Sequence, residues 1–332
     1  MGRRRVARKP PGTKHVFNIF EVRKSGALVF CLLAVVVSLL VHQYRKERVA
    51  DEVIGWVADY EIISTLPHGT DSFTQGFLFS NGSLVETVGQ FGKSRVLRID
   101  ADTGDIIKET AFPDSDFAEG ISSTGTGEFA VLTWQSGRGY LVDSSSLDFK
   151  GEWKFDGDGW GLTLNEDERE LYLSDGSATI RVLDPGSLKE TRRIQVADRG
   201  RSIHLLNELE FIGDEIWANV YGTLLLARID PLSGTVNSWV DCYGIFSVTR
   251  ETVHVSIMNG IAYDRERNRL FVTGKNWPYI YQIRVLQDFV VDDVAYLDPI
   301  FFNRSYLSSY QRALSLKVDV SGVPLSRSRG HW

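Results

Sequence analysis

The sequence predicts an all-β fold, a five-bladed β-propeller of four-stranded blades, preceded by one N-terminal transmembrane helix. A unit made of an apolar stretch, a polar turn and a second apolar stretch recurs five times after residue 70. Two further short stretches follow each of the first four units, with turns rich in Gly, Asp and Pro. Short strands that repeat about every 40 to 50 residues are typical of propeller blades.

The N-terminal element is the uncharged apolar run SGALVFCLLAVVVSLLV at residues 25–41. Basic residues precede it, which favours a cytosolic N-terminus, and no small-residue cleavage pattern follows it. We interpret the run as a type II signal anchor, with a cleaved signal peptide as the alternative. Its short length suits a thin membrane of the secretory pathway, ER or Golgi, with the main body in the lumen.

The expected organisation is a basic cytosolic tail (1–24), a transmembrane signal anchor (25–43), a stalk (44–58), the propeller (59–286) and a partly disordered C-terminal extension (287–332). Residues 1–50 carry 11 basic and two acidic residues, which leaves 26 basic and 41 acidic residues in the rest. An acidic main body argues against nucleic acid as a partner. Two sequons, at Asn81 and Asn303, agree with a lumenal glycoprotein, and the first is predicted at a hairpin tip.

The repeats align on Gly76, Gly120, Gly161, Leu209 and Gly260, at spacings of 44, 41, 48 and 51 residues. The fifth unit ends after its third stretch, PYIYQIRV, and an unpaired strand edge there would be costly. The stretch DYEIISTLP at 59–67 precedes the first unit. We predict that it supplies the missing fourth strand and closes the ring. An open β-sandwich of similar strand count is the alternative.

One mouth of the propeller is the expected functional site, because the first strand of each blade lines the central channel and begins at the same face. The residues just ahead of the aligned positions are Gln75, Glu119, Trp160, Glu208 and Asn259. The ends of the second strands carry Glu86, Trp134, Asp175, Tyr221 and Lys275. Together they predict a small polar pocket with aromatic walls. For each residue the alternative is a structural role, in packing or in binding backbone across the channel.

The motifs FTQG, FAEG, DGWGL, LNELE, EIWANV, NGIAYD and LFVTGK occur in this order. As a set they resemble the plant and bacterial type of glutaminyl-peptide cyclotransferase, over about residues 60–285. The resemblance implies a five-bladed propeller and an acyltransferase that converts the N-terminal glutamine of peptides and proteins to pyroglutamate, releasing ammonia. The functional positions of the family carry onto Phe73, Gln75, Phe117, Glu119, Trp134, Trp160, Asn207 and Lys275. The sequence departs from the family at Ala118, commonly glycine, and at Tyr221, commonly tryptophan.

Cyclisation needs a group that takes a proton from the α-amine and gives one to the leaving amide nitrogen. Glu119 is the only acid that the resemblance marks, so we expect it to be this proton shuttle, with a pKa raised by its apolar neighbours. Lys275, Gln75 or Asn207 is expected to stabilise the oxyanion, and the sequence does not decide which. An aromatic cage of Phe73, Trp134, Trp160 and Tyr221 is expected to fold the substrate side chain for attack.

No metal or other cofactor is expected for catalysis. The six histidines show no H-x-x-H or H-E-x-x-H spacing, although a structural ion in the channel stays open. A non-catalytic propeller that binds peptides or a protein partner at the same mouth is the alternative to an enzyme. Glu119 and Lys275 together favour the enzyme, because a binding module does not need both.

Overall fold

The computed structural model describes residues 55–245 and 257–291. The predicted cytosolic tail, the predicted anchor, most of the predicted stalk and Asn303 lie outside these ranges. Within the described ranges no helix is long and apolar enough to cross a bilayer. The transmembrane anchor at 25–43 stays a prediction.

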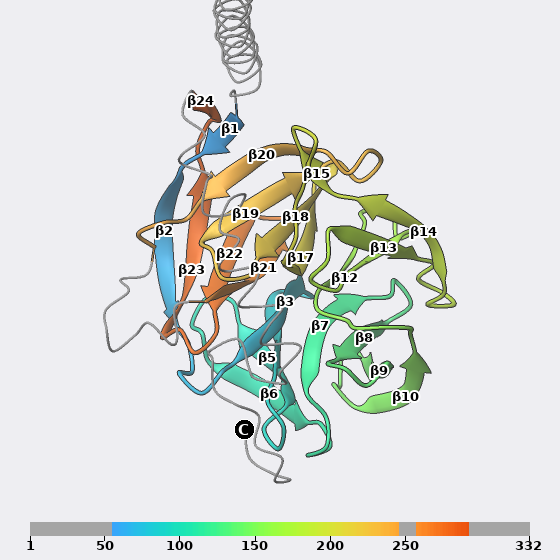
Figure 1. The fold of residues 1–332 in the computed structure, drawn as a ribbon. Coiled ribbons are helices and arrows are strands. Elements are labelled where there is room, and N and C mark those ends of the chain that lie inside the picture. Colours follow the sequence, from blue (N-terminus) through green and yellow to red (C-terminus); the bar gives the residue numbers. More distant parts are fainter. Residues whose placement is uncertain (1–54, 246–256, 292–332) are drawn as a thin grey trace, which may run out of the picture. The chain divides into compact units, whose positions relative to one another are not determined.

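The described strands form five blade sheets, one of which has two extra strands, and one separate two-stranded sheet (Figure 1). Blade 1 contains β3 (Thr74–Ser80), β4 (Ser83–Val88), β5 (Arg95–Asp100) and β6 (Ile106–Ala111). Blade 2 contains β7 (Ala118–Ser123), β8 (Glu128–Thr133), β9 (Arg138–Asp143) and β10 (Phe149–Lys154). Blade 3 contains β11 (Leu162–Leu164), β12 (Leu171–Ser174), β13 (Thr179–Leu183) and β14 (Glu190–Gln195).

Blade 4 contains β17 (Leu206–Ile212), β18 (Glu215–Val220), β19 (Leu225–Ile229) and β20 (Val236–Asp241). Blade 5 contains β21 (Met258–Asp264), β22 (Arg269–Gly274), β23 (Tyr279–Val285) and, from the N-terminal side of the chain, β2 (Tyr60–Pro67). A small hairpin of β15 (Ala197–Asp198) and β16 (Arg201–Ser202) connects blades 3 and 4.

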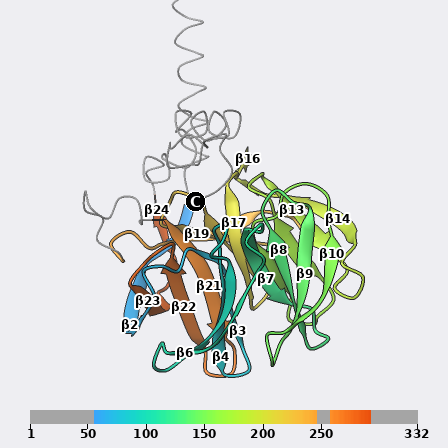
Figure 2. The ribbon, with the colours of Figure 1, turned by 90° about the horizontal axis from the view of Figure 1, so that it is seen from below.

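The ring closes as predicted. Strand β2 pairs antiparallel with β23, beside which it lies in Figure 2, and so completes blade 5. Each first strand contacts the first strands of both neighbouring blades, including β21 with β3. The five-bladed propeller of four-stranded blades is therefore confirmed, and the open sandwich is excluded.

The position of a strand within its blade follows from its sequence. The first strands are rich in small and apolar residues, and the first five residues of both β3 and β7 are buried. The fourth strand of blade 1, IIKETA, carries charges and is largely exposed. Strands that are covered on both faces read as continuous apolar runs, whereas edge strands need polar side chains.

Two strands extend the sheet of blade 4 beyond the predicted propeller boundaries. β1 (Gly55–Ala58) pairs parallel with β20, and β24 (Phe289–Val291) pairs antiparallel with β1. The stalk was expected to reach residue 58 and the propeller to end at 286. The sheet instead begins at residue 55 and includes 289–291, because the outer edge of β20 offers unpaired backbone groups to β1, and the free edge of β1 then offers its own to β24.

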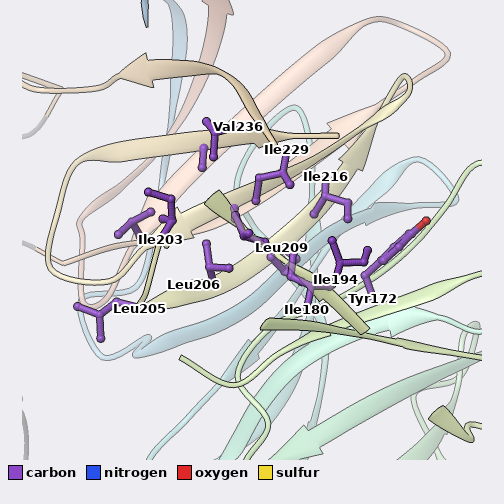
Figure 3. Close-up of a cluster of buried hydrophobic side chains, with 14 of the residues drawn as sticks. Tyr172, Ile180, Ile194, Ile203, Leu205, Leu206, Leu209, Ile216, Ile229 and Val236 are labelled. Carbon is purple, nitrogen blue, oxygen red and sulfur yellow. The ribbon is translucent and has the colours of Figure 1, made fainter. Parts of the chain in front are cut away.

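Buried hydrophobic side chains of the described residues form five clusters, one between each pair of neighbouring blades. Figure 3 shows the cluster between blades 3 and 4, where Ile180 and Ile194 lie near Leu209 and Ile216. Leu205 and Leu206 belong to the same cluster and lie at the start of β17. The packing between sheets thus fixes the backbone from which the residues at the mouth project.

The sequon at Asn81 lies at the tip of the β3–β4 hairpin, as predicted. Asn81 and Gly82 are both exposed and have φ angles of 51° and 79°. Two consecutive residues with positive φ are typical of a type I′ turn, for which Asn-Gly is a favoured pair.

Candidate functional site

Four of the five first strands carry one extra residue close to the mouth. The pairing of β3 with β4 shifts between Thr74 and Gly76, and equivalent shifts occur in β7, β17 and β21. Such bulges re-aim a side chain and are common next to active sites. The extra residues are called the bulge positions and are Gln75, Glu119, Asn207 and Asn259. In blade 3, where the first strand has no bulge, Trp160 precedes the aligned Gly161 and takes the equivalent place.

This register corrects the prediction for blade 4, which placed Glu208 in the ring instead of Asn207. Glu208 takes the place of the glycine that follows the bulge in the other blades. Its carboxylate lies across the channel and accepts hydrogen bonds from Ile261 N at 2.8 Å and Phe77 N at 3.3 Å. Glu208 therefore ties blade 4 to blades 5 and 1, the structural alternative stated for these residues.

A second ring follows the ends of the second strands. Its members, called the turn positions, are Gly89, Trp134, Asp175, Tyr221 and Lys275, each followed by a residue with positive φ. The prediction gave Glu86 for blade 1, which is wrong, because Glu86 lies inside β4 opposite Phe77 and contacts His68. The true turn position is Gly89. A Cβ at Gly89 would lie 2.4 Å from the ring of Phe117, so this ring fills the space that a side chain at position 89 would need.

Three polar side chains are connected across blades 5, 1 and 2. Lys275 Nζ donates to Gln75 Oε1, and Gln75 Nε2 donates to Glu119 Oε1 at 3.0 Å. Lys275 also donates to the carbonyl of Thr74 at 3.1 Å and lies 4.6 Å from the centre of the Phe73 ring. The other oxygen of Glu119, Oε2, accepts no hydrogen bond from any residue in the described ranges.

Burial shifts the pKa values of both charged groups towards neutrality. It raises the pKa of Glu119 well above its ordinary value of 4.5, while Lys275 opposes the rise and Asp158 adds to it. Burial also lowers the pKa of Lys275 to about 8, against the effect of Glu119 and Glu208. A carboxyl group and an ammonium group so shifted are typical of sites for proton transfer.

The two amide side chains of blades 4 and 5 differ. Asn259 donates to the carbonyls of Thr74 at 3.0 Å and Gln75 at 3.3 Å, so it ties blade 5 to blade 1. The Oδ1 atoms of Asn259 and Asn207 both lack a hydrogen-bond partner among the described residues. Asn207 is only 3% exposed, and its Nδ2 also forms no hydrogen bond to a described residue, so the whole amide is free. A buried amide without a partner costs stability and is commonly retained for a ligand.

Aromatic side chains surround this polar centre. Phe73 meets Phe117 edge-on at 6.2 Å between ring centres, and Phe117 meets Trp134 at 5.5 Å. Trp160 contacts Tyr221 at 5.9 Å, in an edge-on geometry. The predicted cage of Phe73, Trp134, Trp160 and Tyr221 is thus brought to one mouth, with Phe117 in it.

The backbone of the bulge residues is held by the neighbouring blade. Thr87 Oγ1 donates to the carbonyl of Glu119 at 2.5 Å, and Ser174 Oγ donates to that of Asn207 at 2.6 Å. A Cβ at Gly161 would lie 2.0 Å from the carbonyl oxygen of Asn207, so only glycine permits this approach. Rigid positioning of Glu119 and Asn207 follows from these contacts.

Sequence reasoning missed two residues near the mouth. Phe91, on the turn after β4, contacts the rings of Phe117 at 5.5 Å and Trp134 at 6.5 Å. Asp158 accepts hydrogen bonds from the backbone of Gln135 and Gly159, both at 3.1 Å, and interacts with the indole of Trp160. Asp158 stands two residues before Trp160, as Phe117 does before Glu119, and this shared offset was the available signal.

Among the residues of 55–245 and 257–291, no group of three His, Cys, Asp or Glu side chains has the geometry of a metal site. The carboxylate of Glu119 has Gln75 as its hydrogen-bond neighbour. The arrangement offers an acid–base group, a cation and a free amide within an aromatic wall. It can carry out proton transfer on a small polar group that the wall encloses.

Comparison with known proteins gives three findings. A family model described as glutamine cyclotransferase matches residues 32–285. A glutaminyl-peptide cyclotransferase of Arabidopsis thaliana is 37% identical over 238 residues, which are 70% of this chain and 72% of the relative. The crystal structure of Myxococcus xanthus glutaminyl cyclase superposes with a TM-score of 0.63 at 27% identity, covering 71% of this chain and 99% of that chain.

Proposed function

The chain belongs to the glutamine cyclotransferase family, and we propose that it cyclises the N-terminal glutamine of peptides and proteins to pyroglutamate, releasing ammonia. In class it is then an acyltransferase, because the γ-acyl group moves from the amide nitrogen to the α-nitrogen. The observation that carries the proposal is the buried carboxyl of Glu119, with one oxygen fixed by Gln75 and the other without a partner among the described residues.

We propose that Glu119 is the proton shuttle. The α-amine attacks the γ-carbonyl carbon, a C–N bond closes the five-membered ring, and the bond to the amide nitrogen breaks. An α-ammonium loses two protons on this route, and the leaving nitrogen gains one to depart as ammonia. A carboxyl group whose pKa is raised well above its ordinary value can accept and return that proton. The free Oε2 atom is the expected contact point.

We propose that Asn207 and Lys275 divide the polar recognition. Lys275 already binds Gln75 and the carbonyl of Thr74, so its charge orients Gln75 and favours the oxyanion through the local field. Asn207 has the free amide, so it is the expected direct partner of the reacting carboxamide. The aromatic side chains exclude water and hold the glutamine side chain in a folded conformation.

Ammonia release from a Gln-led dipeptide by the purified full-length protein tests this function. The expected result is one ammonia per peptide and a product that no longer reacts as a primary amine. The matched control is the same peptide with its α-amine acetylated, which lacks the nucleophile and should release nothing. A folded protein that binds the dipeptide without releasing ammonia would make it the peptide-binding propeller instead.

We also propose a type II topology, with the propeller in the lumen of the secretory pathway and a carbohydrate on Asn81. The apolar run at 25–41 and its basic flank support it, as does the exposed position of Asn81 on a hairpin tip. Endoglycosidase should reduce the apparent mass, and Asn81→Gln should remove part of that shift. Digestion of the propeller by protease added outside sealed microsomes would contradict this topology.

A further inference from the structure

A buried ion pair lies directly behind the site and has no part in the chemistry above. His68 Nε2 lies 3.1 Å and 3.2 Å from the two carboxylate oxygens of Glu86. The side chain of His68 is 2% exposed and that of Glu86 is fully buried. Thr74 Oγ1 donates to Glu86 Oε1 at 2.7 Å. Both residues are thus enclosed beneath the start of β3, which carries Gln75.

The hydrogen bonds of His68 and the charge of Glu86 together favour a protonated imidazole. His68 Nδ1 lies 2.7 Å from the carbonyl of Trp277, which can only accept, so Nδ1 carries a proton. Burial alone would lower the pKa of His68, but Glu86 raises it above its ordinary value, with a smaller contribution from Asp71. An imidazolium that donates to Glu86 and to the carbonyl of Trp277 satisfies both ring nitrogens.

The pair joins two segments that both carry site residues. Residues 68–75 lead into β3 and contain Phe73 and Gln75, while residues 274–278 contain Lys275. Besides the contacts of His68 and Lys275, the segments are connected by four hydrogen bonds: His68 N to Pro278 O, Asn276 N to Ser72 O, Asn276 Nδ2 to Thr70 O and Thr74 Oγ1 to Gly274 O. This seam lies between blade 1 and blade 5, where the N-terminal strand β2 closes the ring.

We propose that His68 and Glu86 are positioning residues for the cyclisation, which hold Thr74 and Lys275 at the separation that keeps Lys275 Nζ on Gln75. The inference rests on the proposed function. His68 holds the carbonyl of Trp277, two residues after Lys275, and Glu86 holds the hydroxyl of Thr74, one residue before Gln75. The pair therefore sets the distance between the backbone at Lys275 and the backbone at Gln75. A shift of about 1 Å in such an arrangement can cost about 10²-fold in rate.

The test must separate positioning from stability, because removal of one member of a buried ion pair destabilises the fold. In the double variant His68→Asn with Glu86→Gln, no buried charge remains, so the fold is expected to survive. The shorter Asn side chain no longer reaches the side chain at position 86, so the tie is broken. The control is Asp264→Asn with Arg269→Gln, which removes a largely buried ion pair at the other end of β21 and β22, together with the contact of Arg269 with the exposed Asp102.

We expect the His68–Glu86 double variant of the full-length protein to lose at least about tenfold in kcat on a Gln-led dipeptide, with KM little changed. The control pair should lower the thermal midpoint and leave kcat within about twofold. In a Lys275→Met background the His68–Glu86 substitutions should add less than about twofold, because they act through Lys275. Wild-type kcat in the double variant, or full additivity with Lys275→Met, would overturn the inference.

A milder variant covers the case in which the double variant shows no cooperative unfolding. Thr74→Val keeps the shape of Thr74 but removes its hydrogen bond to Glu86, so kcat should fall as in the double variant. An unchanged kcat would overturn the proposal.

Glu86→Gln alone should retain kcat, because the new amide can donate to a neutral His68 and still accept from Thr74. A loss of kcat equal to that of the double variant would also overturn the proposal. Absence of ammonia release by the wild-type protein would reject the proposed function itself.

Discussion

The two sides of the mouth are built in different ways. On the polar side, in blades 5 and 1, Lys275, Gln75 and Asn259 all form hydrogen bonds to each other or to the backbone of β3. On the aromatic side, in blades 2 to 4, Trp134, Trp160 and Tyr221 lie in ring contacts, and Asp158 also interacts with the indole of Trp160. The side chain of Asn207 on this side forms no hydrogen bond to a described residue, whereas Asn259 on the polar side donates two. Glu119 lies between the two sides and is bonded only towards the polar one.

The difference indicates that the two sides of the mouth have different roles in the reaction. Groups that are already hydrogen-bonded cost no reorganisation during the reaction, so the polar side is suited to stabilising charge as it develops. Groups held by packing, and a free amide, are suited to binding the substrate. Substitutions on the polar side should therefore lower turnover, while those on the aromatic side should act mainly on binding.

The largest effect is expected at Glu119, where the two sides meet. Glu119→Gln keeps the shape but cannot carry a proton, so turnover should fall by at least about 10²-fold with a modest change in KM. Ammonia release at saturating dipeptide measures this. Glu128→Gln, in the adjacent strand β8, is the control. Near-normal turnover of Glu119→Gln would assign the proton transfer to another group.

The same variant gives a stability test with a defined sign. Because the pKa of Glu119 is raised in the folded protein, its burial opposes folding at pH values above the ordinary 4.5, where the unfolded chain ionises. Glu119→Gln should therefore hold or raise the thermal midpoint at pH 7, and the gain should shrink as the pH falls towards 4.5. A collapsed midpoint at neutral pH would indicate that Glu119 ties the blades together.

Asn207 tests whether the free amide belongs to the substrate. Asn207→Leu should reduce kcat/KM by about 10- to 10²-fold, because the reacting carboxamide loses a partner. The thermal midpoint should hold or rise, because the amide oxygen has no hydrogen bond to lose. The comparison is Asn219→Leu in β18, which should lower the midpoint because Asn219 Oδ1 accepts from Gly260 N at 2.9 Å. A fall in the midpoint of Asn207→Leu equal to that of Asn219→Leu would make Asn207 structural.

The pH profile should report the charge on the polar side. The pKa of Lys275 is about 8, so its ammonium is lost as the pH rises through that value. We expect kcat at saturating peptide to fall about tenfold per pH unit above this point. Two Gln-led peptides whose α-amines differ in pKa should show this decrease of kcat at the same pH. If the pH of the decrease changed with the peptide, the titrating group would belong to the substrate instead.

Smaller effects are expected at the aromatic wall. Tyr221→Ala should raise KM by about 2- to 10-fold and change kcat less, since it removes an edge-on ring contact with Trp160. Tyr221→Trp should be tolerated. Equal losses in kcat and kcat/KM for Tyr221→Ala would give this wall a transition-state role and break the division proposed here.

No change is expected on metal removal. Glu119 and Lys275 supply acid–base and charge functions without a metal ligand set in the described residues. Dialysis against a strong chelator, followed by the dipeptide assay with and without added zinc, checks this. Loss of activity that zinc restores would contradict the proposed chemistry.

Sequence patterns predicted the fold well because blade strands alternate with Gly and Asp turns, and the closing strand is recognisable as an orphan. The site was predicted where a glycine marks the bulge, as at Gly76 and Gly120. In blade 4 the pattern pointed to Glu208, one residue after the true bulge position Asn207. Glu208 replaces the marking glycine there, and only the strand pairing reveals the register. His68 gave no signal because its partner, Glu86, is 18 residues away and the contact depends on how the ring closes.

Strand β2 has a consequence for biosynthesis. It is made early but has no partner until β23 leaves the ribosome, and Ser64 is 218 residues away from the Gln282 side chain that it contacts. Contacts between distant segments form slowly, since a long loop must close first. Lys275 meets Gln75 only when that loop closes, so a chain that lacks β21 to β23 should have at most four complete blades and no assembled site. Enzyme activity should consequently appear last during folding, after the blades themselves have formed.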